Sequence, residues 1–189
     1  MTLDHEVLAE LAAAAGGGDR AAMESLLAAL YDPICVVTRR ICGPDHDDAT
    51  QQTLIAVARG IRRFDGRSAV TTWVYRIATN AALDEMRRRA RHGSHADLES
   101  AEVLDRPAPY DQVDDQLLIA HALESLTPDH RAAVVLREVA QLDYAEIADI
   151  LEIPVGTVRS RLARARRHLA EALTQGNESF IVDVQQGEP

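Results

Sequence analysis

Apolar residues recur every three or four positions through two long stretches of the chain, and this helical period is interrupted once. The pattern of amphipathic α-helices runs from about 19 to 91 and again from 113 to about 175. The 21 residues between them, 92–112, contain Gly93, Pro107 and Pro109 and have no period. Because an ordinary loop within a domain is shorter, we expect an all-α protein with two helical domains joined by a flexible acidic linker.

The expected boundaries follow this pattern. They are an N-terminal extension at 1–18, a first helical domain at 19–91, the linker at 92–112, a second helical domain at 113–175 and a C-terminal tail at 176–189. The first domain is predicted to hold helices at 21–42, at about 45–64, and from a cap at Thr71 or Thr72 to Arg91. In the second domain, Thr127-Pro128 predicts one helix start. A capping box at Asp143 and Glu146 predicts another.

The charges are segregated along the chain. All 20 basic residues are Arg, and the formal net charge of −10 would by itself argue against a nucleic-acid partner. However, residues 59–91 carry nine Arg against three acidic residues, and 159–167 carry five Arg and no acidic residue. The segment 97–115 holds seven acidic residues against one Arg. Two basic blocks separated by an acidic one favour an anionic partner.

Other classes of protein are disfavoured. No run approaches 18 uninterrupted apolar residues and the N-terminus is acidic, so we expect a cytoplasmic protein without membrane insertion. Cys35 and Cys42 lie about 10 Å apart on one helix, too far for a disulfide. No cofactor, metal site, catalytic residue or enzymatic activity is expected. His92 and His95 lack a third ligand, and His121 and His130 are interpreted as surface histidines.

A short helix, a tight turn and an Arg-rich helix follow Asp143, which is the order of a helix-turn-helix. The apolar stripe of the last helix consists of Val155, Val158, Leu162, Ala165 and Leu169. The opposite face carries Arg, Ser and Thr side chains and no acidic residue. Such a face suits the major groove of DNA, where Arg reads guanine and a small residue lets the helix approach.

Two long motifs resemble one protein family. The strings LTPDHRAAVVLREVAQLDYAEIADIL and IPVGTVRSRLARARRHL resemble region 4 of the extracytoplasmic-function (ECF) sigma factors. The string DHDDATQQTLIAVARGIRRFDGRSAVTTWVYRIATNAALDEMRRR resembles their region 2. The resemblance implies an alternative sigma factor that recognises the −10 and −35 promoter elements and promotes strand opening. It also implies three partners: core RNA polymerase (through its clamp helices and flap), promoter DNA and an anti-sigma factor.

The resemblance implies roles for individual residues. For the −35 element, the residues expected to contact bases are Arg159, Ser160, Ala163 and Arg164. The residues expected to contact phosphates are Thr157, Arg167 and Arg131. For the −10 element, Phe64, Ala69 and Asn80 line a pocket for a flipped base, and Trp73 lies at the upstream edge of the bubble. Arg76 and Arg87 to Arg89 hold phosphates. Polymerase contacts fall to Asp48, Gln51, Gln52 and Ile55, with Gln52 standing where the family usually has Glu. Core packing is the alternative role for Phe64 and Trp73.

Two other functions remain open at this stage. One is a stand-alone helix-turn-helix regulator with an N-terminal sensing domain, and the other is an adaptor such as an anti-sigma decoy. A single-strand reader between Phe64 and Arg91 favours the sigma factor, because a regulator has no use for one. The linker length allows both spread and compact arrangements of the two domains, and its acidic residues are predicted to mask the basic faces.

Overall fold

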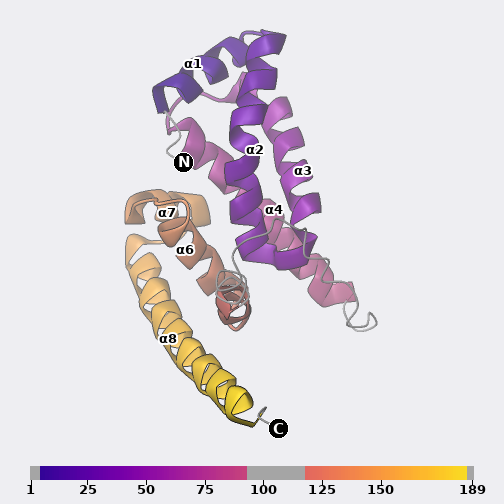
Figure 1. Cartoon of the computed structure of the whole chain (residues 1–189). Helices are drawn as coiled ribbons and strands as arrows, with labels where there is room; N and C mark the ends of the chain where they lie inside the picture. Colours follow the sequence, from indigo (N-terminus) through magenta and orange to yellow (C-terminus); the bar gives the residue numbers. More distant parts are fainter. Residues whose placement is uncertain (1–4, 93–117, 187–189) are drawn as a thin grey trace.

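The computed structural model describes the backbone of residues 5–92 and 118–186, and the side chains of residues 5–91 and 118–173 (Figure 1). The helices in the first half are α1 (His5–Gly16), α2 (Arg20–Cys42), α3 (His46–Gly60) and α4 (Val70–His92), with short 3-10 turns η1 (Gly43–Asp45) and η2 (Ile61–Arg63). The second half holds a helical segment at 118–124, then α6 (Pro128–Glu138), α7 (Tyr144–Leu151) and α8 (Val155–Gln186). No strand occurs in these described ranges, and the all-α prediction is confirmed.

The N-terminal bundle is built around α2, which packs against α1, α3 and α4. Asp19 caps this helix, because its carboxylate accepts a hydrogen bond from the backbone N of Ala22 at 3.1 Å. Leu26, Leu30 and Ile34 recur along one face of α2 and are fully buried. The hydroxyl groups of Thr38 and Thr50 bond at 2.7 Å and tie α2 to α3. The bundle is therefore held by an apolar stripe and one buried polar link.

The helix α1 was not predicted, since 1–18 was expected to be an extension. Leu8, Ala12 and Ala15 of α1 are buried in the same core as α2 and the start of α4. Their spacing of four and three residues is that of a helical stripe. The residues 5–16 thus form a structural part of the N-terminal bundle.

One segment of the described chain, Arg20–Arg63, contains a window apolar and long enough to cross a membrane by composition alone. Its most apolar part is α2, whose inward face supplies Leu26, Leu30 and Ile34 to the bundle core. The central helix of a soluble bundle has the same composition as a membrane span. The packing of α2 on α1, α3, α4 and α6 favours the role of a core helix.

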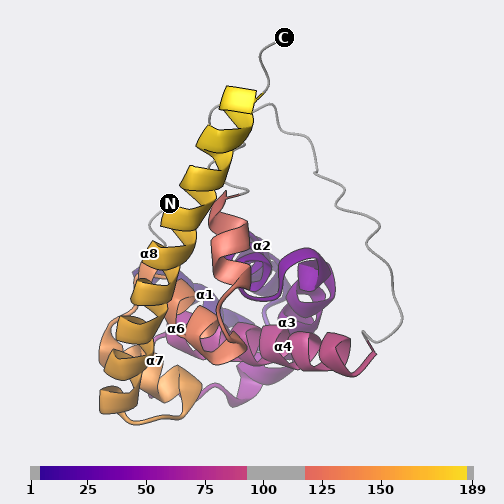
Figure 2. The ribbon, with the colours of Figure 1, turned by 90° about the horizontal axis from the view of Figure 1, so that it is seen from below.

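In the C-terminal half, local capping signals determine where the helices begin. The hydroxyl of Thr127 accepts a hydrogen bond from the backbone N of His130, and Pro128 occupies the first position of α6. Asp143 and Glu146 form the expected capping box of α7. The helix α8 projects from the rest of the molecule toward the C-terminus (Figure 2). Both predicted helix starts are confirmed.

Two expectations differ from the structure, and a third falls on residues that the structure does not describe. The helix α4 begins at Val70, and Thr71 and Thr72 lie buried inside it, so the predicted cap is wrong. The Thr72 hydroxyl donates to the carboxylate of Glu146 at 3.2 Å, and the buried Thr71 hydroxyl has no hydrogen-bond partner among the described residues. The helix α8 continues to Gln186, beyond the tail boundary at 176, because one Gly costs a helix only about 1 kcal/mol. Nearly all of the predicted linker, including its acidic residues, lies outside the described residues.

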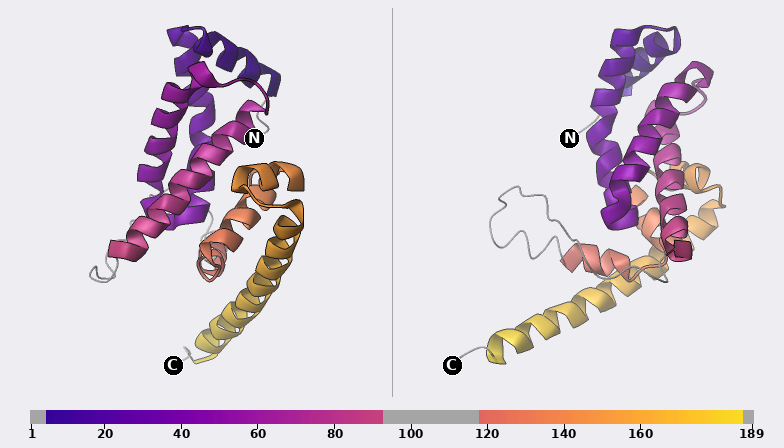
Figure 3. Two further views of the ribbon diagram at one scale, coloured as in Figure 1. Left: turned by 180° about the vertical axis from the view of Figure 1, so that it is seen from behind. Right: turned by 90° about the vertical axis from the view of Figure 1, so that its right-hand side faces the viewer.

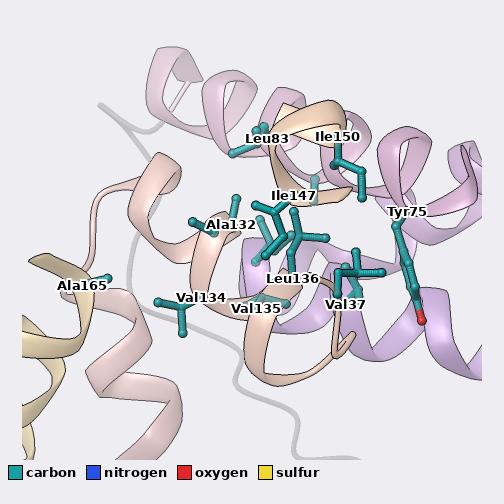
Figure 4. Packing of buried hydrophobic residues seen from close by; sticks show 14 of the residues in the cluster. Val37, Tyr75, Leu83, Ala132, Val134, Val135, Leu136, Ile147, Ile150 and Ala165 are labelled. Atoms are coloured by element: carbon teal, nitrogen blue, oxygen red, sulfur yellow. The ribbon is translucent and has the colours of Figure 1, made fainter. Parts of the chain in front are cut away.

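One buried hydrophobic cluster spans the two halves (Figure 4). The helix α6 packs on α2 and α4, and α7 packs on α4 (Figure 3). Val37 and Tyr75 from the N-terminal bundle lie in the same buried cluster as Leu136 and Ile147 from the C-terminal helices (Figure 4). The compact arrangement of the two domains is therefore stabilised by apolar burial across their boundary.

Candidate nucleic-acid interface

The first part of the candidate site is the helix-turn-helix formed by α7 and α8. The carboxylate of Asp143 accepts hydrogen bonds from the backbone N of Ala145 and Glu146, at 2.7 and 2.8 Å. The carboxylate of Glu146 accepts one from the backbone N of Asp143 at 2.9 Å. After α7, Glu152 adopts a left-handed conformation with φ of 54°, which turns the chain sharply before α8 begins. Local interactions therefore fix both ends of α7, with the capping box at its start and the left-handed Glu152 at its end.

The exposed face of α8 carries the residues predicted for the −35 element. Val158, Leu162 and Ala165 are buried on one side. On the other side, Thr157 is half-buried, and Arg159, Ser160, Ala163, Arg164 and Arg167 are exposed. The structure therefore presents these six residues together along the outer side of one helix, as the spacing predicts.

The five Arg residues of this segment have different surroundings. Arg161 pairs with Asp129 at 2.7 Å, and Arg166 pairs with Glu138 at 2.8 Å. Within the described ranges, no ion pair involves the other three, namely Arg159, Arg164 and Arg167. The unpaired guanidinium groups are therefore the ones on the face opposite the core, and they remain available for an anionic ligand.

The second part of the candidate site surrounds the start of α4. The rings of Phe64 and Trp73 lie with centroids 5.1 Å apart and planes tilted by 39°. Both residues are half-buried and pack on the core of the N-terminal bundle. Trp73 also lies against Gly60, where a Cβ would approach the indole to 3.0 Å. Core packing thus accounts for one side of each ring and leaves the other side exposed.

A pocket of about 470 Å³ opens beside Phe64 and Ala69. Leu8 and Ala12 of α1 line another wall, and the loop before α4 completes it. Asn80 does not line this pocket. It is exposed on α4, 11 residues after Ala69, which corresponds to about 16 Å along a helix. The three residues predicted to form one pocket are therefore distributed along a surface.

The Arg residues predicted to hold −10 phosphates already have protein partners. Arg76 donates from Nη2 to the carbonyl O of Asp149 at 2.9 Å, and Thr72 donates to the carboxylate of Glu146 at 3.2 Å. These bonds join α4 to α7. Arg87, Arg88 and Arg89 form ion pairs with Asp84, with Glu85 and Asp48, and with Asp45, respectively. In this arrangement, DNA would have to replace these contacts.

The residues predicted to contact polymerase lie together on α3. Asp48, Gln51, Gln52 and Ile55 are all exposed, and 43% of the Ile55 surface is accessible. Ala49, Thr53 and Val57 on the opposite side of α3 are buried. A large apolar side chain among exposed polar ones is typical of a protein-binding surface.

Comparisons with known proteins agree on one family. Residues 27–92 match the family model "Sigma-70 region 2", and residues 116–169 match "Sigma-70, region 4". The ECF RNA polymerase sigma factor SigM of Mycobacterium tuberculosis is 38% identical over 168 residues, which cover 87% of this chain and 84% of that protein. The ECF RNA polymerase sigma-E factor of Haemophilus influenzae is 33% identical over 162 residues, covering 79% and 86%. The chain belongs to the ECF RNA polymerase sigma factors.

Solved structures place this sigma factor in the same fold. RpoE from Bartonella quintana, crystallised with the anti-sigma factor NepR, is 28% identical with a TM-score of 0.67, over 80% of this chain and 96% of that one. CnrH, solved with the cytosolic domain of CnrY, is 24% identical with a TM-score of 0.69, over 91% and 99%. The comparisons favour the sigma factor over the stand-alone regulator.

The structure corrects one residue role in this sigma factor. Arg131 was predicted to contact phosphate, but only 7% of it is exposed. Its guanidinium donates to the carbonyl O of Ile41 at 3.0 Å and of Glu124 at 2.9 Å. Burial lowers the pKa of this guanidinium below its ordinary value, which stays far above neutral pH. Arg131 is a structural link between the two halves, and the phosphate prediction is wrong.

The two thiols lie on α2 and have different surroundings. Cys35 and Cys42 are free, as expected. Burial raises the pKa of Cys42 to about 12, so its thiol stays protonated. Within the described ranges, no group of three or more His, Cys, Asp or Glu side chains is placed to hold a metal ion.

Proposed function

We propose that this sigma factor binds core RNA polymerase through α3, reads the −35 element with α8 and reads the −10 element with the surface from Phe64 to Asn80. The observation that carries the proposal is the selective pairing of Arg on α8. Arg161 and Arg166 are tied to carboxylates, whereas Arg159, Arg164 and Arg167 are unpaired on the exposed face. This is the side that a helix-turn-helix presents to the major groove.

The −10 surface suits a melted strand. The pocket beside Phe64 and Ala69 has the size and the aromatic edge that an unstacked base requires. Asn80 lies farther along α4, where its amide group would bond a neighbouring nucleotide. A strand that follows α4 from the pocket to Asn80 would therefore be read at more than one position, which fits a role in strand opening.

The proposed partners follow from these surfaces. The group of Asp48, Gln51, Gln52 and Ile55 would meet the polymerase clamp helices, and the C-terminal domain would meet the flap. An anti-sigma factor is expected to hold the compact arrangement, since the related sigma factor RpoE was solved with such a partner. We place the protein in the cytoplasm with the polymerase, without a cofactor and without an enzymatic activity of its own.

Reconstitution with core polymerase tests the proposal. The purified chain should co-elute with bacterial core RNA polymerase and direct run-off transcription from promoters identified by sequencing transcripts after overexpression. Ile55→Arg should weaken core binding by about tenfold or more, since a charge in an apolar contact is costly. Val36→Arg is the matched control, because Val36 is also exposed, at 46%, and lies on α2 outside the group of residues proposed to meet the polymerase. Promoter-specific binding without core polymerase, and no binding to core, would favour the stand-alone regulator.

A further inference from the structure

A second concave site lies between the first turn of α6 and the middle of α8. This pocket of about 280 Å³ is lined by His130, Arg164, Arg167, His168 and Glu171. From the sequence alone, His130 is expected to be a surface histidine, and His168 has no predicted role. The convergence of two imidazoles and two guanidinium groups is therefore a feature that only the folded chain shows.

The packing of α6 on α8 produces this convergence. Arg164, Arg167, His168 and Glu171 follow one another at spacings of three, one and three residues, which places them on one side of α8. The ion pair between Asp129 and Arg161, at 2.7 Å, holds the first turn of α6 beside them. His130, the residue after Asp129, is thereby brought over Arg164 and His168.

The charge in this pocket favours an anion. Arg164 and Arg167 have no ion pair among the described side chains, while Asp129 is engaged by Arg161. Glu171 is the one carboxylate of the lining. Burial lowers the pKa of His130, and the nearby Arg161, Arg164 and His168 lower it further, whereas Asp129 raises it. Burial, and after it these positive neighbours, therefore disfavour protonation of His130 in the free protein, and a bound anion would offset the effect of the positive charges.

We propose that this pocket binds one phosphate group of the DNA backbone, next to the bases that α8 reads. His130 and His168 are the ligands of this phosphate, beside Arg167. The proposal rests on the proposed function of α8 and extends it to residues on α6. The pocket adjoins the exposed face of Arg159, Ser160 and Ala163, so a duplex in contact with that face brings its backbone over the pocket. Phosphate is matched by guanidinium and imidazolium donors.

The bound phosphate makes DNA binding dependent on pH. Its negative charge stabilises the protonated imidazoles, so the pKa of each histidine is higher in the complex than in the free protein. Binding then takes up protons, and affinity rises as the pH falls from about 8 to 6, the range in which histidine titrates. A difference of one pKa unit between free and bound forms corresponds to about a tenfold change in affinity.

The proposed phosphate site can be tested by measuring how tightly the full-length chain binds a fluorescein-labelled 20-base-pair duplex. The duplex has a mixed sequence, because a phosphate contact is independent of sequence. At constant ionic strength, wild-type affinity should rise about three- to tenfold between pH 8 and pH 6. The variant His130→Gln/His168→Gln should lose this rise, so its affinity should fall below that of the wild type more at pH 6 than at pH 8. His121→Gln is the control, since His121 is exposed and lies outside the pocket.

The salt dependence of DNA binding provides a second measurement. A purely structural role of His130 and His168 would leave this salt dependence unchanged. At pH 6, the double variant should lower the slope of log affinity against log salt by about one to two, and at pH 8 it should leave the slope unchanged. A double variant that keeps the wild-type pH dependence would overturn the proposal. Equal losses at both pH values would also overturn it.

NMR titration of the histidine C2 protons identifies the source of the phosphate. The duplex should raise the pKa of both His130 and His168, and inorganic phosphate at 10 mM should do so less. Shifts produced by inorganic phosphate and not by the duplex would overturn the assignment to DNA. The proposed function is judged separately, by transcription with core polymerase, so the two conclusions fail independently.

Discussion

Arg131 on α6 donates a hydrogen bond from Nη1 to the carbonyl oxygen of Ile41, at 3.0 Å, in the last turn of α2. The two residues are 90 positions apart, and both are buried. A guanidinium beside the carbonyl end of a helix is favourable, because that end carries partial negative charge. The same guanidinium also bonds Glu124 and Leu126 through their carbonyl oxygens. Arg131 thus joins the end of α2 to the turn that precedes α6.

Loss of this link should destabilise the fold. Arg131→Met keeps the apolar stem and removes the donors, so buried carbonyl groups lose their partners. We expect a decrease of about 2–4 kcal/mol in the free energy of unfolding, measured by urea denaturation. Arg20→Met is the control, because the pair between Arg20 and Glu24 is exposed and should contribute at most about 0.5 kcal/mol. Equal effects of the two changes would contradict the assignment of Arg131 to a buried link.

The contrast between Asp143 and Arg131 shows which features can be predicted from sequence. The cap of α7 depends on Asp143 and Glu146, whose bonds close over three residues. The cap of α7 and the outer face of α8 both follow from the spacing of residues in the sequence, and both were predicted correctly. The position of Arg131 depends on Ile41, which reaches it only when α6 docks on α2. An Arg near the start of a helix has no local signal that distinguishes this role from a phosphate contact.

The same reasoning explains the other differences. Thr71 and Thr72 have the composition of a helix cap, but contacts with the rest of the protein bury them inside α4. The role of α1 in the pocket beside Phe64 depends on how α1 packs at the end of the bundle. The pairing of Arg161 and Arg166 with α6 likewise requires the folded chain. Helical period predicts which side of a helix is buried, and it does not predict which element covers that side.

Base readout on α8 should depend on the unpaired Arg residues. Arg159→Ala should cost about 1–3 kcal/mol in binding of the holoenzyme to its −35 duplex, and should relax the base preference at one position. Arg166→Ala is the matched control, because the same residue type on the same helix is tied to Glu138 at 2.8 Å and lies to one side of the face. Binding to a set of single-base promoter variants measures both effects. Identical profiles for the two variants would show that the exposed face was assigned wrongly.

The two thiols should differ in reactivity. Burial raises the pKa of Cys42 from 9.0 to about 12, and Cys35 is less buried although its pKa is also raised. Since the thiolate is the reactive form, iodoacetamide at pH 8 should modify Cys35 first and Cys42 only after unfolding. Mass spectrometry of tryptic peptides measures both rates. Fast modification of Cys42 in the folded protein would contradict its burial.

The raised pKa of Cys42 also predicts the sign of a pH effect on stability. The folded chain retains the thiol proton more tightly than the unfolded chain does. The contribution of this proton to the free energy of unfolding is therefore complete below the unfolded pKa of 9.0. This contribution is lost as the pH rises from 9.0 toward about 12. Cys42→Ala should therefore show a smaller decrease in stability between pH 8.5 and 10 than the wild type. Parallel decreases would contradict this linkage.

Asn80 should act in strand opening and not in folding. Its side chain is exposed on α4, so Asn80→Ala should leave the free energy of unfolding and the affinity for core polymerase unchanged. Unstacking a base costs a few kcal/mol, which contacts to the melted strand must offset. Loss of the Asn80 amide should remove about 1–3 kcal/mol of that stabilisation, which corresponds to a decrease of about 5- to 150-fold in open complex. Permanganate reactivity and run-off transcription on a duplex promoter measure this decrease.

A premelted promoter separates opening from recognition. A template mismatched across the −10 element needs less unpairing, so it should partly rescue Asn80→Ala, whereas a folding or polymerase-binding defect would persist on both templates. Asp84→Ala is the control on the same helix, because Asp84 is exposed one turn beyond Asn80 and pairs with Arg87 at 2.7 Å. Equal defects on duplex and premelted templates would argue against strand opening as the affected step. Normal opening of the duplex by Asn80→Ala would remove Asn80 from the −10 surface and leave the pocket beside Phe64 as its main element.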